Sequence, residues 1–466
     1  MEIIAHATAP RKPTGHNWPL MVIPKLSVGV KRTAARSAPL RTAATRSAAT
    51  LGAATLIVAT ALCGGFATRV NAQAPARPVT PPVASKAPVA PTQDYWVYVG
   101  AESADRIYRV KFGPGGTKVE KTIDIGELSA EMEGPHGLQI SHDGKYLYMT
   151  TGHGTPDGKY WRYALGPDTL VGPGIFLGNF PASIDVTPDG DYTFSANFNL
   201  HGDMVPSTVS VVYTPTNTEV ARIVTCTMPH GSRVSPDGRR QYSTCMMDDQ
   251  LVEIDAVNFA VAPRFGLAKG KEGPIKTEKA MAGMDHSHMI STTATAAKPA
   301  VDPAQVGAGG MQHEMTANSC SPTWAQPSLD NKSVYVACNK SDDIIQIDVK
   351  SWKLVRHIRT GRGVYNIAMT PDGKLMVASL KQGSMIEVFD LASGRSLVQL
   401  PTSNIIAHGV TISSDSKYAF VSSEGKGAMP GKVDVIDLVA LEKAGTVDVG
   451  QQASGITFWK SAPVKP

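Results

Sequence analysis

Three histidines occur in the same local context at widely separated places in the chain. They lie in Pro135-His136-Gly137, Pro229-His230-Gly231 and Ala407-His408-Gly409. Three imidazoles with an open fourth position are a common arrangement around a reactive copper or zinc ion. His136, His230 and His408 therefore predict a metal site if the fold brings them together. The alternative is that each imidazole bonds to the backbone of a neighbouring segment or faces water.

A second group of metal-ligand residue types lies in one Ala-, Thr- and Gly-rich segment. Five Met and three His fall within 35 residues, without the hydrophobic periodicity that would place the Met in a core. Thioether sulfur suits Cu(I) and imidazole suits either oxidation state of copper. We expect copper binding here; the alternative is a tether in which these residues are incidental. The candidate ligands are Met281, Met284, His286, His288, Met289, Met311, His313 and Met315.

A short tight turn repeats along the chain and identifies the elements that must position these residues. Each copy has an apolar run, a Ser-Pro-Asp-Gly-like turn, and a strand that ends in small or polar residues. A period in the forties that consists only of strands is typical of a β-propeller. The turns are Ser141-His-Asp-Gly144, Thr187-Pro-Asp-Gly190, Ser235-Pro-Asp-Gly238, Ser328-Leu-Asp-Asn331, Thr370-Pro-Asp-Gly373 and Ser413-Ser-Asp-Ser416.

Aligning the turns gives seven starts of inner, channel-lining strands. They fall at His136, Ala182, His230, Thr323, Tyr365, His408 and Ser454, with intervals of 46, 48, 93, 42, 43 and 46 residues. The last repeat supplies only an inner strand, whereas residues 95–126 supply three strands without one. Pairing the two would close the ring and leave no open edge. We predict an all-β, seven-bladed propeller with four antiparallel strands per blade, and the long interval places an insertion between blades 3 and 4.

The register also places further candidates on the face that carries the insertion. His153, His201 and Met204 follow second strands, and Tyr365 shares the level of the three histidines as a ligand or hydrogen-bond donor. Cys226 and Cys320 precede inner strands of blades 3 and 4, while Cys245 and Cys338 end the second strands of those blades. Neighbouring strand ends favour the disulfides Cys226–Cys245 and Cys320–Cys338. Ligation of a soft metal by thiolates is the alternative.

The second strands resemble those of the YVTN family of propeller repeats. The residues that carry this resemblance include Leu147-Tyr-Met-Thr-Thr and Val334-Tyr-Val-Ala-Cys-Asn, and it covers about residues 94–460. It implies the propeller fold, whereas proteins with this fold differ widely in function. The run Met284-Asp-His-Ser-His-Met289 is similar to segments of periplasmic copper-resistance proteins, which implies copper as the ligand.

The N-terminal part has the features of an exported protein. Residues 1–72 carry nine basic residues and one acidic residue, and an uncharged stretch is followed by Val70-Asn-Ala72. We expect a signal peptide over 1–72, a Pro/Ala-rich linker over 73–92, the propeller over 93–462 and the Met/His loop over 273–319. The expected location is periplasmic or secreted, and membrane attachment is expected only if the leader is retained.

Composition and motifs exclude several classes of function. The chain without its leader has a net charge of −3, from 36 basic and 39 acidic residues, which argues against a nucleic-acid partner. The sequence has no nucleotide, haem or quinone motif and no recognisable catalytic constellation. We expect an exported copper-binding protein: a chaperone, scavenger or sensor. The alternatives are a copper-dependent oxidoreductase that uses the three histidines, and a scaffold for a periplasmic protein partner without metal.

Overall fold

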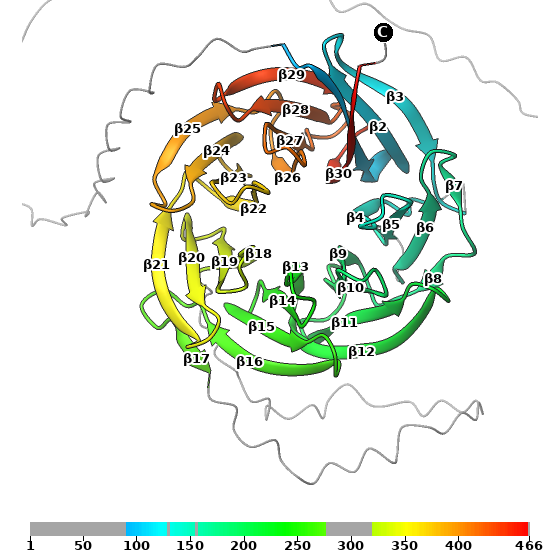
Figure 1. The fold of residues 1–466 in the computed structure, drawn as a ribbon. Coiled ribbons are helices and arrows are strands. Elements are labelled where there is room, and N and C mark those ends of the chain that lie inside the picture. The colour runs from blue at the N-terminus through cyan, green and yellow to red at the C-terminus, as the bar shows by residue number, and fades with distance from the viewer. Residues whose placement is uncertain (1–89, 128–130, 154–156, 276–318, 465–466) are drawn as a thin grey trace, which may run out of the picture. The chain divides into compact units, whose positions relative to one another are not determined.

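The protein is a seven-bladed β-propeller in which each blade is an antiparallel sheet around a central channel (Figure 1). The computed structural model describes residues 90–127, 131–153, 157–275 and 319–464. Among these residues, no helix is long and apolar enough to cross a membrane, and the only helix is the three-residue 3₁₀ helix η1 (Glu102–Ala104). The predicted all-β propeller is confirmed.

Blades 1 to 3 follow one another along the chain from the inner strand outwards. Blade 1 divides its outer position between β7 and β8, which both pair with β6, and blade 3 adds β17 outside β16. Blade 1 consists of β4 (Pro135–Ile140), β5 (Tyr146–Thr151), β6 (Lys159–Ala164), β7 (Thr169–Leu170) and β8 (Ile175–Phe176); blade 2 of β9 (Pro181–Val186), β10 (Tyr192–Asn197), β11 (Pro206–Tyr213) and β12 (Thr218–Thr227); blade 3 of β13 (Pro229–Val234), β14 (Arg240–Cys245), β15 (Gln250–Asp255), β16 (Ala260–Gly266) and β17 (Gly273–Ile275).

Blades 4 to 6 have four strands each, and blade 7 contains both ends of the described chain. The order β3-β2-β1-β30 confirms the predicted ring closure, because the C-terminal strand is the inner strand of a blade begun at the N-terminus. Blade 4 consists of β18 (Pro322–Pro327), β19 (Ser333–Cys338), β20 (Asp343–Asp348) and β21 (Lys353–Arg359); blade 5 of β22 (Val364–Met369), β23 (Leu375–Leu380), β24 (Met385–Asp390) and β25 (Ser396–Pro401); blade 6 of β26 (Ala407–Ile412), β27 (Tyr418–Ser423), β28 (Lys432–Asp437) and β29 (Glu442–Asp448); blade 7 of β30 (Ala453–Pro463), β1 (Gln93–Ala101), β2 (Arg106–Gly113) and β3 (Gly116–Asp124).

The repeated turn joins the inner strand to the second strand in blades 1 to 6. In blade 3, Ser235 Oγ donates to Asp237 Oδ1 at 2.5 Å and accepts from the Arg240 amide at 3.0 Å. The fourth residue, Gly238, has a φ of 71°, a conformation that glycine adopts at little cost. Asn331 and Ser416 adopt the same left-handed conformation in blades 4 and 6, with φ of 58° and 62°. The turn is therefore retained where the glycine is not.

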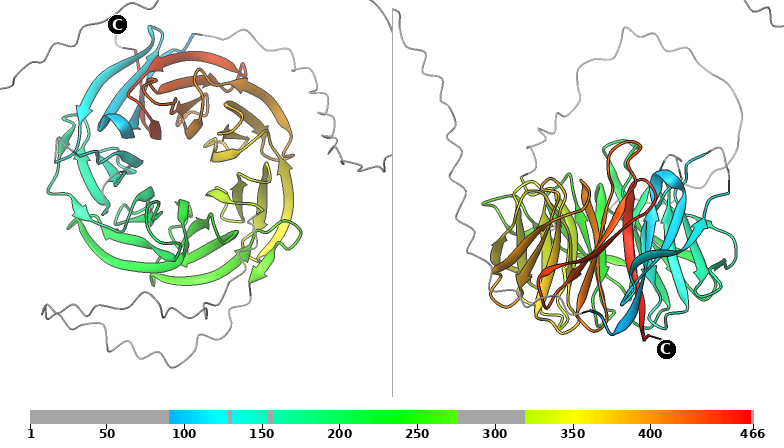
Figure 2. Two further views of the ribbon diagram at one scale, coloured as in Figure 1. Left: turned by 180° about the vertical axis from the view of Figure 1, so that it is seen from behind. Right: turned by 90° about the horizontal axis from the view of Figure 1, so that it is seen from above.

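The hydrophobic core lies between adjacent blades. At the boundary of blades 6 and 7, the rings of Tyr95 and Phe112 pack edge-on against Tyr418, with centroid distances of 5.0 and 4.9 Å. Second strands such as β19 are buried throughout, whereas the outer strand β21 is mostly exposed. Viewed from the side, the strands of neighbouring blades stand next to one another around the ring (Figure 2). This packing fixes the radial position of each inner strand, and with it the residues that face the channel.

Candidate functional site at the channel mouth

The inner strands present equivalent residues at the mouth of the channel. Each predicted position lies one residue after the start of its inner strand, in all seven blades. His136, His230 and His408 come together there, with ring centroids 6.0 Å apart for His136 and His230 and 5.3 Å apart for His136 and His408. All three imidazoles are buried. The structure thus brings together side chains that are as much as 272 residues apart in the chain.

One nitrogen of each of two histidines is bonded to the next inner strand. His136 Nδ1 lies 2.5 Å from the Ala182 carbonyl oxygen, and His230 Nδ1 lies 2.9 Å from that of Thr323. A carbonyl only accepts, so both Nδ1 atoms carry hydrogen and a neutral ring keeps its lone pair on Nε2. The Ser454 backbone lies next to His408 as the Ala182 backbone lies next to His136, but His408 Nδ1 makes no hydrogen bond of good geometry with it. The two interpretations of the histidines are therefore compatible: they converge, and they bond to neighbouring backbone.

The other nitrogens face polar side chains. The Tyr365 hydroxyl lies 3.0 Å from His230 Nε2 and donates to it, because the proton of the neutral ring is on Nδ1. His136 Nε2 lies 3.7 Å from Glu102 Oε1, and His408 Nε2 lies 3.7 Å from Glu424 Oε1. Tyr365 is thus a hydrogen-bond donor in this structure. Its ring also lies beside His408, with centroids 4.7 Å apart.

Glu102, Lys381 and Glu424 belong to the site but were not predicted from the sequence. Each directly follows the second strand of its blade, after β1, β23 and β27 respectively. Lys381 Nζ lies 2.9 Å from Glu424 Oε1 and 4.2 Å from the centroid of the Tyr365 ring. The residue after each second strand can be identified in the aligned repeat. In blades 5, 6 and 7 this residue is charged, and that charge could have identified it as part of the site.

Burial and neighbouring charges determine the ionisation of the site. Burial lowers the pKa of His230 to about 3 and lowers the pKa of His408 well below its usual value, so both rings are neutral at pH 7. Burial raises the pKa of Tyr365 to about 12, so its hydroxyl keeps the proton that it donates. Burial alone would raise the pKa of Glu102, but His136 and His153 outweigh it and the pKa falls. The mouth therefore combines the neutral imidazoles of His230 and His408 with an ionised, buried carboxylate at Glu102.

The secondary candidates lie beside this carboxylate. His153 Nδ1 is 2.7 Å from Glu102 Oε2, and hydrogen bonding to Glu102 raises the pKa of His153. The rings of His153 and His201 have centroids 6.0 Å apart. Met204, by contrast, is 58% exposed. Glu102 therefore connects His153 to His136, which the sequence did not indicate.

Both predicted disulfides are present in the structure. Cys226 pairs with Cys245, and Cys320 pairs with Cys338. The alternative prediction, that these four cysteines bind a metal ion as thiolates, is therefore wrong, because all four are in disulfides. Next to Cys320, the Asp249 carboxylate accepts from the Ser319 and Ser321 amides at 2.5 and 2.7 Å. These contacts fix the point at which the inserted segment rejoins blade 4.

The Met/His ligands predicted between blades 3 and 4 lie outside the described residues. They are Met281, Met284, His286, His288, Met289, Met311, His313 and Met315. Within the described part of the chain, no three or more His, Cys, Asp or Glu side chains form a group that could hold a metal ion as they stand. At the mouth, the Tyr365 hydroxyl occupies the Nε2 lone pair of His230. Metal binding at the mouth thus requires Tyr365 to give up this bond or the ion to bind beside it.

Comparisons with known proteins show similarity in fold only. No protein-family model matches the chain, and no curated protein sequence matches it. Hydrazine synthase from Kuenenia stuttgartiensis is similar in structure, with 16% identity and a TM-score of 0.51 over 72% of this chain and 92% of that one. A functionally unknown protein from Desulfotomaculum acetoxidans is similar with 13% identity and a TM-score of 0.52 over 77% of this chain and all of that one (100%). At these identities, the chain is similar to both proteins in fold alone.

Proposed function

We propose that this protein is an exported metal-binding propeller, with copper as its ion and the channel mouth as its retaining site. The observation that carries the proposal is the contact between His136 and Glu102. The Nδ1 hydrogen of His136 is directed at a carbonyl, so Nε2 is the ring nitrogen that faces a buried Glu102 carboxylate oxygen, at 3.7 Å. When Nε2 carries no proton, these two atoms are acceptors that face each other away from water, and a cation between them satisfies both.

The surroundings of the histidines favour a metal cation in that position. Histidine ligands of metals commonly donate their second ring nitrogen to a carbonyl or carboxylate, which fixes the tautomer and the ring orientation. His136 and His230 make such bonds, to Ala182 and Thr323. The neutrality of His230 and His408 also suits metal ligation, because a protonated imidazole has no lone pair to donate. His136 Nε2, His408 Nε2 and Glu102 would be the primary ligands, with His230 available if Tyr365 moves.

The choice of copper depends on the sequence of the inserted segment. Imidazole and carboxylate alone also suit zinc, iron or nickel, whereas the thioethers between Met281 and Met315 favour Cu(I). In this proposal the segment captures copper and the mouth retains one ion. Two disulfides support an exported location, since such bonds persist in oxidising compartments.

The test is copper titration of the purified, metal-free full chain and of three variants. Deletion of residues 276–318 should remove most of the bound copper and leave one ion. His136→Ala in the deletion background should remove that last ion, whereas His142→Ala, in a turn at the far end of β4, should not. The proposal for the mouth fails if His136→Ala binds as much copper as its parent. If the full chain binds no copper, a metal-free scaffold is the function that remains.

A redox assay of the copper-loaded protein separates storage from catalysis. A retained ion that cycles between Cu(I) and Cu(II), while an added reductant is oxidised and an added oxidant is reduced, would support the copper-dependent oxidoreductase instead. A binding protein would hold the ion without such turnover.

A further inference from the structure

The channel has a second level of side chains immediately below the histidines. The residue after each histidine is glycine, and there is a steric reason. A Cβ on Gly231 would lie 2.2 Å from the Thr323 carbonyl oxygen and 2.5 Å from Trp324 Cε3, and one on Gly409 would lie 2.5 Å from the Ser454 carbonyl oxygen. These glycines permit close approach of neighbouring inner strands. The Trp324 indole from blade 4 fills part of the space that they leave.

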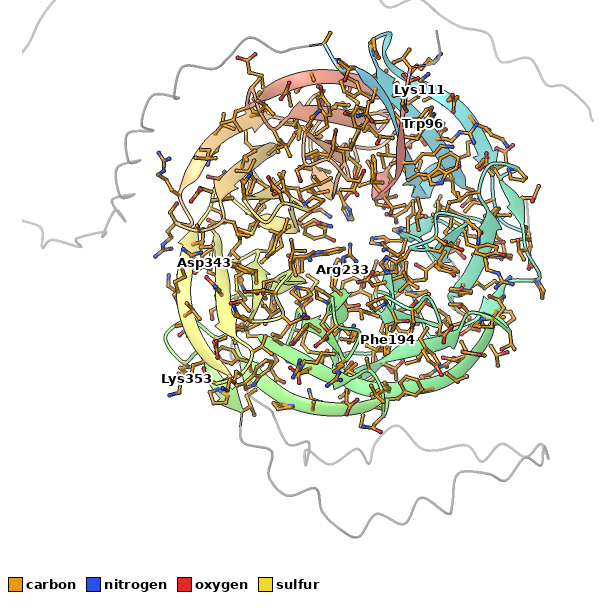
Figure 3. The ribbon with its side chains drawn as sticks, in the orientation of Figure 1. Trp96, Lys111, Phe194, Arg233, Asp343 and Lys353 are labelled. Carbon is orange, nitrogen blue, oxygen red and sulfur yellow. A yellow bond between two sulfur atoms is a disulfide. The ribbon has the colours of Figure 1, made fainter. Side chains whose placement is uncertain are left out.

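Arg233 brings a positive charge to this part of the channel. It comes from inner strand β13, and Figure 3 shows its side chain extending toward the centre of the ring. Its guanidinium carbon lies 4.5 Å from the centroid of the Trp324 ring, and Nη1 donates to the Ser232 carbonyl at 3.0 Å. No carboxylate of the described residues forms an ion pair with it. A guanidinium has five N–H donors, and the acceptors found for it among the described residues are the carbonyls of Ser232 and, at 3.5 Å, of Ile184.

The nearby acid does not neutralise this charge by contact. Asp185 Oδ2 accepts from the Val234 amide at 2.8 Å, and Asp185 Oδ1 accepts from the Val186 amide at 3.0 Å. Both oxygens are thus held by backbone. Asp185 acts on Arg233 only through space.

A second donor, in a side chain that lines the same cavity, also lacks an acceptor. Trp324 is 7% exposed, and its buried Nε1–H has no hydrogen-bond partner. Indole nitrogen is a donor only, and leaving it unpaired costs about 1–3 kcal/mol. Arg233, Trp324, Asn366, His136 and His408 all line this cavity, whose volume is about 20 Å³. That is room for a particle of the size of one or two water molecules.

We propose that the channel below the histidines binds one small inorganic anion, of the size of chloride or nitrite, between the Arg233 guanidinium and the Trp324 Nε1–H. A water molecule would also fit, but it would not neutralise the guanidinium. The Asn366 amide, whose Oδ1 is buried without a partner, can turn its NH₂ group toward the same anion. Sulfate and phosphate are larger, so we expect this small cavity to bind them more weakly than chloride. The proposal does not require a metal ion at the mouth, and it is tested on metal-free protein.

The experiment measures the chloride NMR linewidth in the presence of the full-length, metal-free chain. Binding should broaden the signal, and nitrite should reverse the broadening whereas sulfate should not. Arg233→Gln should weaken binding by about ten-fold or more, because it removes hydrogen bonds from a charged donor. Arg162→Gln is the matched control: Arg162 also bonds a carbonyl, that of Thr214 at 2.6 Å, and lies 5.2 Å from an aromatic ring, that of Tyr146, away from the channel.

Two further variants keep the test decisive if Arg233→Gln fails to fold. Arg233→Lys retains the charge without the forked donor and should bind chloride with intermediate affinity. Trp324→Phe removes the N–H and should also weaken binding, whereas circular dichroism should show a folded propeller in each case. Absence of broadening with the parent protein, equal competition by sulfate, or unchanged binding in the Arg233 and Trp324 variants would overturn the proposal.

Discussion

Removal of the Tyr365 hydroxyl should destabilise the metal-free protein and strengthen its binding of copper. The hydroxyl lies 3.0 Å from His230 Nε2, and the two side chains are only 7% and 2% exposed. In Tyr365→Phe, the Nε2 acceptor stays buried without a donor, which costs about 1–3 kcal/mol of unfolding free energy. An ion that also takes His230 Nε2 as a ligand no longer has to displace a bond whose net value is about 0.5–1.5 kcal/mol, so the affinity should rise about 2- to 13-fold.

Two measurements on the same variant check these opposite effects. Thermal or denaturant unfolding of metal-free protein gives the loss of stability, and titration against a competing chelator gives the copper affinity. Tyr98→Phe is the control, because the Tyr98 hydroxyl makes a buried 2.6 Å bond to Asp168 outside the channel. It should lower stability and leave copper affinity unchanged. A ten-fold fall in affinity in Tyr365→Phe would refute the reasoning, because it would make Tyr365 a ligand and not a competitor.

Three further outcomes are expected. Replacing Cys226 and Cys245 by Ala opens a loop with a sequence separation of 19 and should cost about 3 kcal/mol by the chain-entropy estimate; an unchanged calorimetric Tm would contradict this. The Glu102 contact raises the pKa of His153 above 6.5, so its stabilisation should be present below about pH 6.5 and lost as the pH rises through the folded pKa. Glu102→Gln should abolish the upward shift in an NMR titration of His153, and persistence of the shift would identify another cause. Gly231→Ala should lower the free energy of unfolding by about 1–3 kcal/mol in a denaturant titration, because the new Cβ would overlap the Thr323 backbone. In the control Gly115→Ala, the new Cβ has no atom within 4 Å, and the free energy of unfolding should change by no more than about 0.5 kcal/mol. Equal effects of the two substitutions would argue against the close approach of strands at Gly231.

The fold could be predicted from the sequence because its determinants are local and repeated. The Ser/Thr-x-Asp-Gly turn is stabilised by side chains within five residues of each other, such as Ser235, Asp237 and the Arg240 amide. Such contacts leave a signature in every copy, and the copies give the register of the inner strands. Ring closure followed from counting strands at the two ends. The short strands β8 and β17 have no counterpart in the repeat, and they were not predicted.

The candidate site was predictable only in part, because register does not determine which side chains meet. Alignment identified His136, His230 and His408, which occupy the same position in three blades. Glu102 reaches His136 from the helical turn η1 after β1, in a different blade, and that contact depends on the diameter of the ring. Arg233 was missed for a similar reason. Its role depends on the direction of a long side chain in the channel and on the lack of an ion-pairing carboxylate among the described residues.

The mouth is assembled only when the ring closes. Glu102 follows β1 in blade 7, His136 lies in blade 1, and His408 and Glu424 lie in blade 6. Blade 7 in turn exists only through the pairing of β1 with β30, near the two ends of the described chain. A ligand that binds both Glu102 and His136 therefore stabilises the closed ring relative to any state in which β30 has detached from β1. Because this coupling needs no conformational change within a blade, ligand binding at the mouth should protect the amides of β1 and β30 from hydrogen exchange more than those of β19 or β20, which lie within blade 4.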